Sequence, residues 1–308
     1  MARCSHPHYT LDLGTKENGK RNLKFVGFQP DLSSLAQLSA RYGNKNIVPL
    51  PCGCCLQCYI NHAKEWAVRC MLEALQHEEN YFITLTYDNE NLPKDGSLKK
   101  KDLQDFWKRL RYYFGDFSYL AVGEYGKAGC RPHYHALVFG LHIDDIRLVL
   151  EHRKSKKFEA AWPFGAYSLD EVTYASCNYV AQYTTNKLFK ANDLPGKVKE
   201  FLVCSKKPAI GLNWCKENIS KILEYDAIYG FFGGSKEARV PRYFDRVAEA
   251  LDKEAFDFMK RKRLDKNNSF ELNEMLVHQF ENVERLFEYQ ESITLNDFIR
   301  RKRGQRKL

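Results

Sequence analysis

A predicted β-hairpin near the middle of the chain constrains the fold more than any other feature of the sequence. Tyr119–Tyr125 and His133–Phe139 have the aromatic and aliphatic composition of short strands. Between them lies Gly126-Lys127-Ala128-Gly129, whose two glycines favour a turn. Because a short turn returns the chain alongside itself, these two strands pair in opposite directions.

Strand and helix patterns alternate around this hairpin. The predicted strands are Tyr81–Tyr87 and Tyr167–Tyr174, and the predicted helices are Leu98–Phe114, Ile143–Ala160 and Ser176–Lys190, the last with Ser176 as its N-cap. An antiparallel sheet buries its apolar side chains against helices. We therefore expect an α+β fold with a central antiparallel β-sheet flanked by helices.

The two ends of the chain differ in character from this middle part. Residues 1–50 are polar and interrupted by glycines, which predicts an irregular N-terminal segment. A cysteine cluster at 52–58 follows and leads into a helical stretch to about Glu79. Residues 212–297 are mostly helical in pattern and form a C-terminal extension, and residues 298–308 are predicted to be an unstructured basic tail.

The composition excludes some classes of protein and leaves others open. The chain has 308 residues with 48 Lys+Arg against 39 Asp+Glu, a net charge of +9 that admits an anionic partner without requiring one. No apolar run approaches the roughly 20 residues of a membrane span, so we expect no membrane partner. The N-terminus lacks the apolar core of a signal peptide, and ten cysteines in an unsecreted chain suggest thiols or metal ligands.

His133 and His135 are the first candidate site residues. Residues i and i+2 of a strand point to the same face, so the two imidazoles converge while Tyr134 faces away. Glu124 lies in the partner strand of the hairpin, where its carboxylate comes close to the same face. One carboxylate and two imidazoles suit Mg²⁺, Mn²⁺ or Zn²⁺. An ordinary pair of strand histidines and a solvated glutamate is the alternative.

Tyr179, Tyr183 and Lys187 form a second pattern, in which a spacing of four places all three on one helix face. Such a stripe is usually part of a hydrophobic core, with the lysine reaching to solvent. The functional alternative uses the phenol oxygen as a covalent nucleophile toward a phosphodiester.

Cys52, Cys55 and Cys58 are candidate ligands of a structural zinc ion. They show the C-x₂-C spacing twice, but tetrahedral zinc needs a fourth ligand. Cys4, His6, His8 or Cys70 are candidates for that place. Free or buried thiols are an equally weighted interpretation, because cysteine also packs as a small apolar residue.

These patterns together resemble a known family. Phe82–Tyr87, Arg131–Val138 and Tyr179–Lys187, in this order, resemble the three motifs of the HUH-superfamily rolling-circle replication initiators. The match is closest to the initiators of microviruses of the gokushovirus type, which Pro51–Cys58, Trp66–Cys70 and Ser205–Gly211 also resemble. The tyrosines follow the histidines, as in replication initiators, whereas conjugative relaxases place the tyrosine first.

The resemblance implies an HUH endonuclease fold for a nicking and joining domain at residues 51–211. It implies Tyr179 and Tyr183 as nucleophiles, Lys187 as a helper, and Glu124, His133 and His135 as ligands of Mg²⁺ or Mn²⁺. The implied activity is that of a metal-dependent, site-specific endonuclease and strand-joining transferase. It nicks one strand of the double-stranded replicative form at the origin, keeps a 5′-phosphotyrosine link, primes rolling-circle replication and rejoins the single strand.

The partners implied are origin DNA in double-stranded and single-stranded form, and host DNA polymerase and helicase, in the cytoplasm of a bacterial host. A non-catalytic, zinc-dependent DNA-binding module is the alternative, in which the cysteines and basic charge matter and the tyrosines only pack. A metal hydrolase of the amidohydrolase type also has an HxH strand. That class needs further metal-binding histidines on successive strands of a barrel, whereas this HxH lies in a hairpin in mid-chain.

Overall fold

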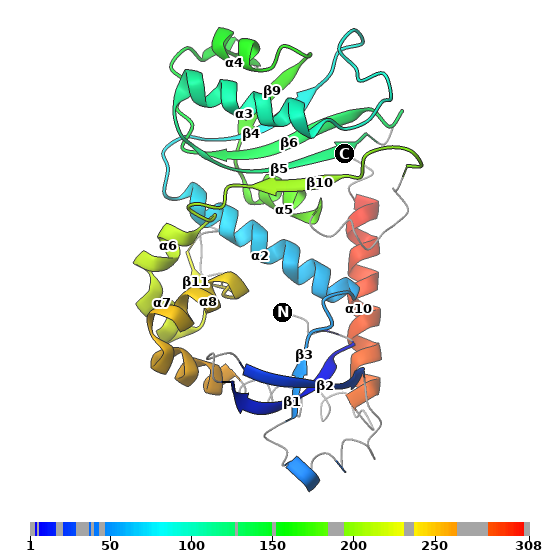
Figure 1. Cartoon of the computed structure of the whole chain (residues 1–308), viewed down its shortest axis with the longest axis vertical. Helices are drawn as coiled ribbons and strands as arrows, with labels where there is room; N and C mark the ends of the chain where they lie inside the picture. Colours follow the sequence, from blue (N-terminus) through cyan, green and yellow to red (C-terminus); the bar gives the residue numbers. More distant parts are fainter. Residues whose placement is uncertain are drawn as a thin grey trace. The chain divides into compact units, whose positions relative to one another are not determined.

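A computed structural model of the chain describes residues 4, 6–16, 21–28, 37, 40–42, 47–126, 129–149, 152–183, 194–230, 237–263 and 283–304 (Figure 1). The chain divides into two compact units. The first comprises Met1–Asn61 with Leu264–Leu308, and the second comprises His62–Arg263. No helix in the described part is long and apolar enough to cross a membrane.

The second unit is built on a five-stranded sheet in which every neighbouring pair is antiparallel. Its strand order is β10 (Phe201–Cys204), β5 (Ser118–Tyr125), β6 (Pro132–Phe139), β4 (Asn80–Thr86) and β9 (Tyr167–Glu171). β5 and β6 form the predicted hairpin. The expectation of an α+β architecture with a central antiparallel sheet is therefore confirmed.

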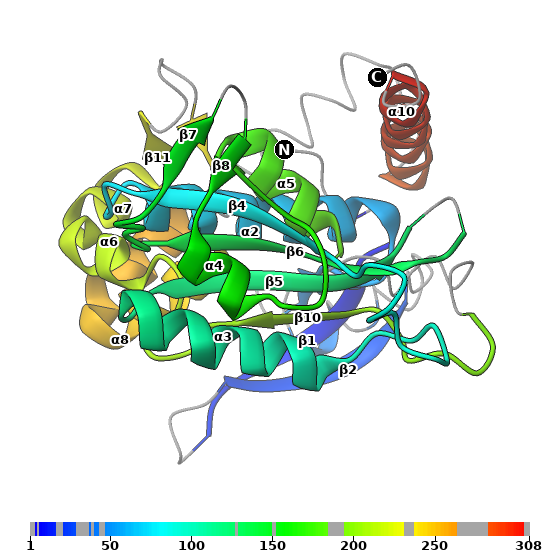
Figure 2. The ribbon, with the colours of Figure 1, turned by 90° about the horizontal axis from the view of Figure 1, so that it is seen from above.

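Helices cover both faces of this sheet (Figure 1). On one face lie α3 (Lys100–Phe114) and α4 (Lys156–Ala161), and Figure 2 looks onto this face. α3 buries its apolar stripe there, because Leu103, Phe106, Trp107 and Leu110 recur at helical spacing. α5 (Tyr174–Gln182) covers the opposite face, together with the part of α2 (Leu56–Ala74) from Ala63 onward.

The remainder of the second unit packs mainly around α2. It contains α6 (Leu212–Glu217), α7 (Ile219–Tyr225), β11 (Ile228–Tyr229), β12 (Glu237–Ala238) and α8 (Arg242–Leu251). Val68 and Leu72 of α2 share a buried cluster with Cys215, Ile222 and Phe244 of these elements. The described part of the C-terminal region is thus mostly helical.

The N-terminal segment is not irregular as predicted. β1 (His8–Thr15) lies between β2 (Arg21–Phe28) and β3 (Ile47–Leu50) in a three-stranded antiparallel sheet of the first unit. Several of its apolar side chains are exposed, Leu13, Leu23 and Phe25 among them. The strands are held by backbone pairing with little burial, and so the sequence lacks the alternation by which strands are recognised.

The predicted helix over Ile143–Ala160 is also wrong. The chain forms a short hairpin there, β7 (Arg147–Val149) and β8 (His152–Lys154), and α4 begins only at Lys156. The side chain of Ser155 caps α4 by accepting a hydrogen bond from the backbone N–H of Phe158 at 3.0 Å. An N-cap residue has non-helical dihedrals, which is why the helix cannot extend through Ser155 toward Ile143.

Two further boundaries differ from those predicted. α5 is capped by Thr173, and Ser176 occupies its third position, where it completes a capping box. The C-terminal helix α10 runs over Val283–Gly304, so the basic residues from Arg300 to Arg303 are helical and not an unstructured tail. The sequence analysis also missed β10, a short edge strand paired with β5.

A buried hydroxyl network fixes the side of β6 that faces α3. The Tyr134 ring is fully buried, and its hydroxyl accepts a hydrogen bond from the Lys99 N–H at 2.9 Å. The Tyr87 hydroxyl lies 2.8 Å from it and donates to a carboxylate oxygen of Asp102, also at 2.8 Å. The middle residue of the His-Tyr-His sequence thus anchors the sheet while its neighbours face the other way.

Replacing Tyr134 with Phe is expected to lower the free energy of unfolding by about 1–3 kcal/mol, because the buried Lys99 N–H loses its acceptor. The Tyr87→Phe/Tyr134→Phe double variant should lose less than the sum of the two single variants, since the hydroxyls are partners. Urea denaturation measures both effects. Tyr112→Phe is the control, because Tyr112 is 84% exposed; equal stability of the Tyr134 and Tyr112 variants would contradict the role of the network.

Candidate metal and tyrosine site

The register of the hairpin creates the candidate site. Glu124 of β5 lies directly opposite His133 of β6, and Val122 lies opposite His135. Side chains that face one another across a strand pair project from the same face of the sheet. Glu124, His133 and His135 therefore lie together on the face that α5 covers.

The three side chains converge closely. The Nε2 atoms of His133 and His135 lie 2.7 and 3.0 Å from the same carboxylate oxygen, Oε1 of Glu124. One ligand atom from each of the three residues falls within 4.8 Å of the others. Glu124 is only 4% exposed, although charged side chains are rarely buried without a partner.

The outer nitrogens of both imidazoles have partners that orient the rings. His133 Nδ1 donates to the backbone carbonyl of Arg131 at 3.1 Å, which leaves the Nε2 lone pair of neutral His133 directed at the site. His135 Nδ1 lies 2.9 Å from the hydroxyl of Thr84, and its ring stacks on Phe82 at a centroid distance of 5.5 Å.

Thr84 and Phe82 are supporting residues that the sequence analysis did not single out. Thr84 lies opposite His135 in the pairing of β4 with β6. The signal was the alternation of Phe82 and Thr84 in the predicted strand, but it becomes informative only when β4 is known to be the neighbour of β6.

Hydrogen bonding controls the charges in this cluster. Burial alone would raise the pKa of Glu124, but the hydrogen bonds with His133 and His135 outweigh burial and lower that pKa to about 2. Burial likewise opposes the charged form of His133, and the hydrogen bond to Glu124 outweighs it and raises the pKa of His133. The carboxylate is therefore ionised, and the cluster favours a positive charge at its centre.

Both tyrosines reach this carboxylate from α5. The Tyr179 hydroxyl donates to Oε1 of Glu124 at 2.9 Å, and the Tyr183 hydroxyl donates to that of Tyr179 at 3.0 Å. The Tyr179 ring also packs edge-on against His135, with centroids 5.2 Å apart. Burial raises the pKa of Tyr179 to about 12, so its hydroxyl is protonated in this arrangement.

The structure thus brings together five of the predicted site residues, Glu124, His133, His135, Tyr179 and Tyr183. Lys187 lies outside the described residues. The interpretation of the tyrosines as core packing does not fit Tyr179, which is 38% exposed. Cys52, Cys55 and Cys58 belong to the first unit and not to this site, and they gather there with Cys4.

The donor set fits a divalent cation. One ionised carboxylate and two imidazole Nε2 atoms converge, and the other nitrogen of each imidazole is hydrogen bonded, as is usual for histidines that bind metal. Three protein ligands leave further coordination positions open, and a mixed oxygen and nitrogen set accepts Mn²⁺, Mg²⁺ or Zn²⁺.

Comparison with known proteins finds a family and several relatives. Residues 80–188 match the family model of the replication-associated protein ORF2. The chain is 36% identical over 251 residues to the "Replication-associated protein ORF2" of Spiroplasma virus 4, covering 73% of this chain and 77% of the relative. No solved structure matches.

Two other relatives carry similar names. The "Replication-associated protein VP4" of Bdellovibrio phage phiMH2K is 31% identical over 209 residues, which is 63% of this chain and 65% of the relative. The "Replication-associated protein ORF4" of Chlamydia phage 1 is 32% identical over 239 residues, which is 68% of this chain and 56% of the relative.

Manganese is expected to stabilise the wild-type protein and not the Glu124→Gln variant, because the neutral amide removes the anionic ligand. At a Mn²⁺ concentration 100-fold above its Kd the gain is about 2.7 kcal/mol, or roughly 5–10 °C in Tm for a domain of this size. Thermal unfolding with and without Mn²⁺ measures it.

The matched control is Glu79→Gln. Glu79 also pairs with an imidazole, Nδ1 of His142 at 2.7 Å, but outside the cluster. This variant should retain the full response to Mn²⁺. If Glu124→Gln responded as strongly as Glu79→Gln, Glu124 would not be a ligand.

Proposed function

Because the chain belongs to the ORF2 family of replication-associated proteins of small single-stranded DNA phages, we propose that it initiates rolling-circle replication by cutting and rejoining one DNA strand through a tyrosine. The second unit would be an HUH-type nicking and joining domain, and Glu124, His133 and His135 its metal ligands. Tyr179 and Tyr183 would be the nucleophiles.

One observation carries the proposal: the Tyr179 hydroxyl is hydrogen bonded to the same carboxylate oxygen that both imidazoles face. A core tyrosine would need no such partner. This arrangement instead places a partly exposed phenol oxygen beside a buried set of metal ligands. A phosphodiester bound between them would meet a nucleophile and an electrophilic centre together.

The metal ligands and the tyrosine have separate tasks. The chemistry that a divalent cation would supply at Glu124, His133 and His135 is polarisation of a non-bridging phosphate oxygen. Glu124 accepts the hydrogen bond that aligns the Tyr179 hydroxyl, at 2.9 Å. The Arg131 carbonyl and the Thr84 hydroxyl hold the imidazoles in place.

The bond changes balance without a cofactor that stores energy. The Tyr179 oxygen loses its proton and forms a bond to phosphorus, and the bond from phosphorus to the 3′ oxygen of the preceding nucleotide breaks. That oxygen takes up a proton and becomes a free 3′-OH, while the 5′ phosphate stays on the tyrosine. In the joining step a 3′-OH attacks the phosphotyrosine and releases the tyrosine, so no ATP is consumed.

Tyr179 would make the first cut and Tyr183 would act in the joining round. Tyr179 donates directly to Glu124, whereas the Tyr183 hydroxyl donates to Tyr179, one helical turn earlier. Two adjacent tyrosines allow the strand to pass from one covalent link to the next. Lys187, as a helper, would hold a tyrosine oxygen or a phosphate.

The proposed partners follow from this chemistry. The protein would bind origin DNA as duplex and as single strand, and the free 3′-OH would be extended by a host polymerase with a host helicase. It would act in the cytoplasm of the bacterial host. The net charge of +9 is consistent with a DNA partner.

A covalent capture assay tests the proposal. The protein is mixed with Mn²⁺ and a randomised single-stranded DNA pool that carries one fluorophore at the 3′ end and another at the 5′ end. On a denaturing gel the 3′ label should move with the protein and the 5′ label should not, because the link is to the 5′ phosphate of the downstream fragment. Sequencing of the captured DNA would give the recognition sequence.

Variants then assign the tyrosines. Tyr179→Phe should lower the initial rate of adduct formation at least 1000-fold, because the nucleophile is removed. Tyr183→Phe should form the first adduct but fail to transfer the strand to a second tyrosine, and the double variant should form none. Tyr225→Phe, an exposed tyrosine outside the site, should resemble wild type.

An adduct that survives the double change would refute the assignment. A protein that binds the DNA pool but never forms an adduct would support the non-catalytic DNA-binding module instead.

A further inference from the structure

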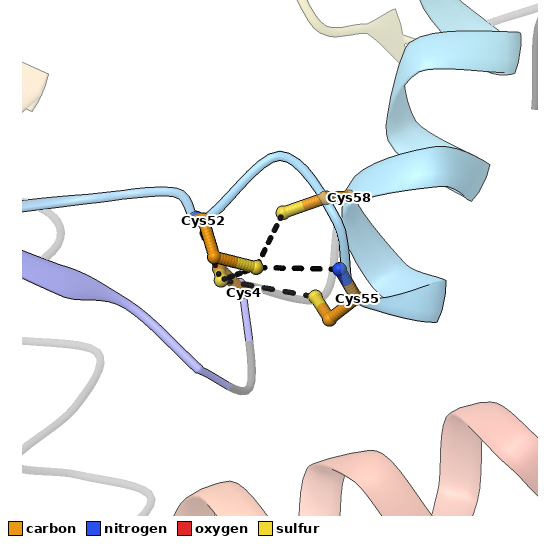
Figure 3. Close-up of side chains that lie close together, drawn as sticks. All are labelled: Cys4, Cys52, Cys55 and Cys58. Atoms are coloured by element: carbon orange, nitrogen blue, oxygen red, sulfur yellow. Dashed lines mark hydrogen bonds between the residues drawn. The ribbon is translucent and has the colours of Figure 1, made fainter. Parts of the chain in front are cut away.

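Four cysteine sulfurs gather at one point of the first unit, which does not contain the tyrosines or the Glu124 cluster. Cys52, Cys55 and Cys58 come from the loop before α2 and from its first turn, and Cys4 comes from the N-terminal segment (Figure 3). One sulfur from each falls within 4.8 Å of the other three. Among the candidates for a fourth position beside Cys52, Cys55 and Cys58, the structure thus selects Cys4.

The sulfur separations match those of a tetrahedral metal site. The Sγ of Cys4 lies 3.4 Å from that of Cys52 and 3.8 Å from that of Cys55, and the Cys52 and Cys58 sulfurs are 3.9 Å apart. A tetrahedron with zinc–sulfur bonds of about 2.3 Å places its sulfurs about 3.8 Å apart. The cluster therefore needs little rearrangement to surround one ion.

Backbone N–H groups point at the sulfurs, as in a loop that stabilises thiolates. The N–H of Cys52 donates to Cys4 Sγ at 3.3 Å, and that of Cys55 donates to Cys52 Sγ, also at 3.3 Å. Gly53 allows this turn because its φ is +74°, which favours glycine. Hydrogen bonds of this kind disperse negative charge on metal-bound sulfur.

The other candidates for the fourth ligand are engaged elsewhere. Cys70 is fully buried in the second unit, in an apolar cluster with Cys177. His6 Nε2 lies 3.6 Å from a carboxylate oxygen of Glu291, and the His8 ring packs against Phe25. Cys54 is exposed and does not belong to the four-sulfur group.

We propose that Cys4, Cys52, Cys55 and Cys58 bind one Zn²⁺ ion as a structural tetrathiolate site. Each thiol gives up its proton to solvent as its bond to zinc forms, so four protons leave for each ion bound and the site carries a net charge of −2. All four positions are filled by protein, which distinguishes a structural zinc site from a catalytic one.

The first unit needs such a crosslink because it buries little apolar surface. Its described residues contribute three buried hydrophobic side chains, Cys4, Leu11 and Phe287. Small domains with so small a core are usually held together by metals or disulfides. The zinc ion would tie the segment before β1 to the loop after β3 and to the first turn of α2.

Metal analysis of the full-length protein tests the site. Purified wild-type protein dialysed against a mild chelator should retain one zinc ion per chain. Cys4→Ser and Cys58→Ser should bind zinc at least 10-fold more weakly and lose it under the same conditions. Cys54→Ser is the matched control, since it removes an exposed cysteine of the same loop and should keep the ion.

Two measurements on the wild-type chain do not depend on variants that fold. Replacement of zinc by Co²⁺ should give the intense visible absorption of tetrahedral cobalt with four thiolates. After denaturation with chelator and no reductant, all ten cysteines of the chain should react as thiols. A count of six would mean two disulfides and would overturn the proposal, as would zinc loss in Cys54→Ser or a Co²⁺ spectrum without thiolate bands.

Hydrogen exchange shows whether the site is structural. Removal of zinc should speed amide exchange in β1, β2 and β3 and leave β4, β5 and β6 of the second unit unchanged. Unchanged exchange in the N-terminal sheet would contradict a structural role. Because this readout involves no DNA, its failure is distinct from a failure of the proposed replication chemistry.

Discussion

The pairing of Glu124 with His133 across the β5–β6 hairpin is the interaction on which the candidate site depends. A shift of the register by one residue would turn Glu124 to the opposite face of the sheet, because side chains alternate along a strand. The register is held from the other face, where the Tyr134 hydroxyl bonds to the backbone of Lys99 and lies beside that of Tyr87. The His-Tyr-His sequence therefore combines two ligands with the side chain that fixes their position.

The sequence predicted the parts of this arrangement that are local. The hairpin, the common face of His133 and His135, and the position of Glu124 all follow from the alternation of a strand and the shortness of a turn. Thr84 could not be recognised, because its role requires β4 to be the neighbour of β6, and the intervening α3 hides that pairing from the sequence. The meeting of Tyr179 with Glu124 requires the packing of α5 on the sheet, which only the resemblance to a family implied.

The first unit was predicted less well for a different physical reason. Its strands expose apolar residues such as Phe25 and leave few side chains buried, so hydrophobic periodicity carries little information there. The one strong signal was the spacing of Cys52, Cys55 and Cys58, and the sequence could not choose the fourth member because Cys4 lies 48 positions before Cys52. Backbone pairing of β1 with β3 brings these two segments together.

The positions of the two tyrosines on α5 explain how a single carboxylate can serve both. The capping box of Thr173 and Ser176 fixes where the helix begins, and Tyr179 then faces Glu124. Tyr183 follows one turn later, at a hydrogen-bond distance of 3.0 Å from the Tyr179 hydroxyl. On the proposed function, a phosphate attached to one tyrosine oxygen therefore stays within reach of the other. A stripe that packing alone would explain becomes a relay because its first member lies beside a buried acid and is itself only partly covered.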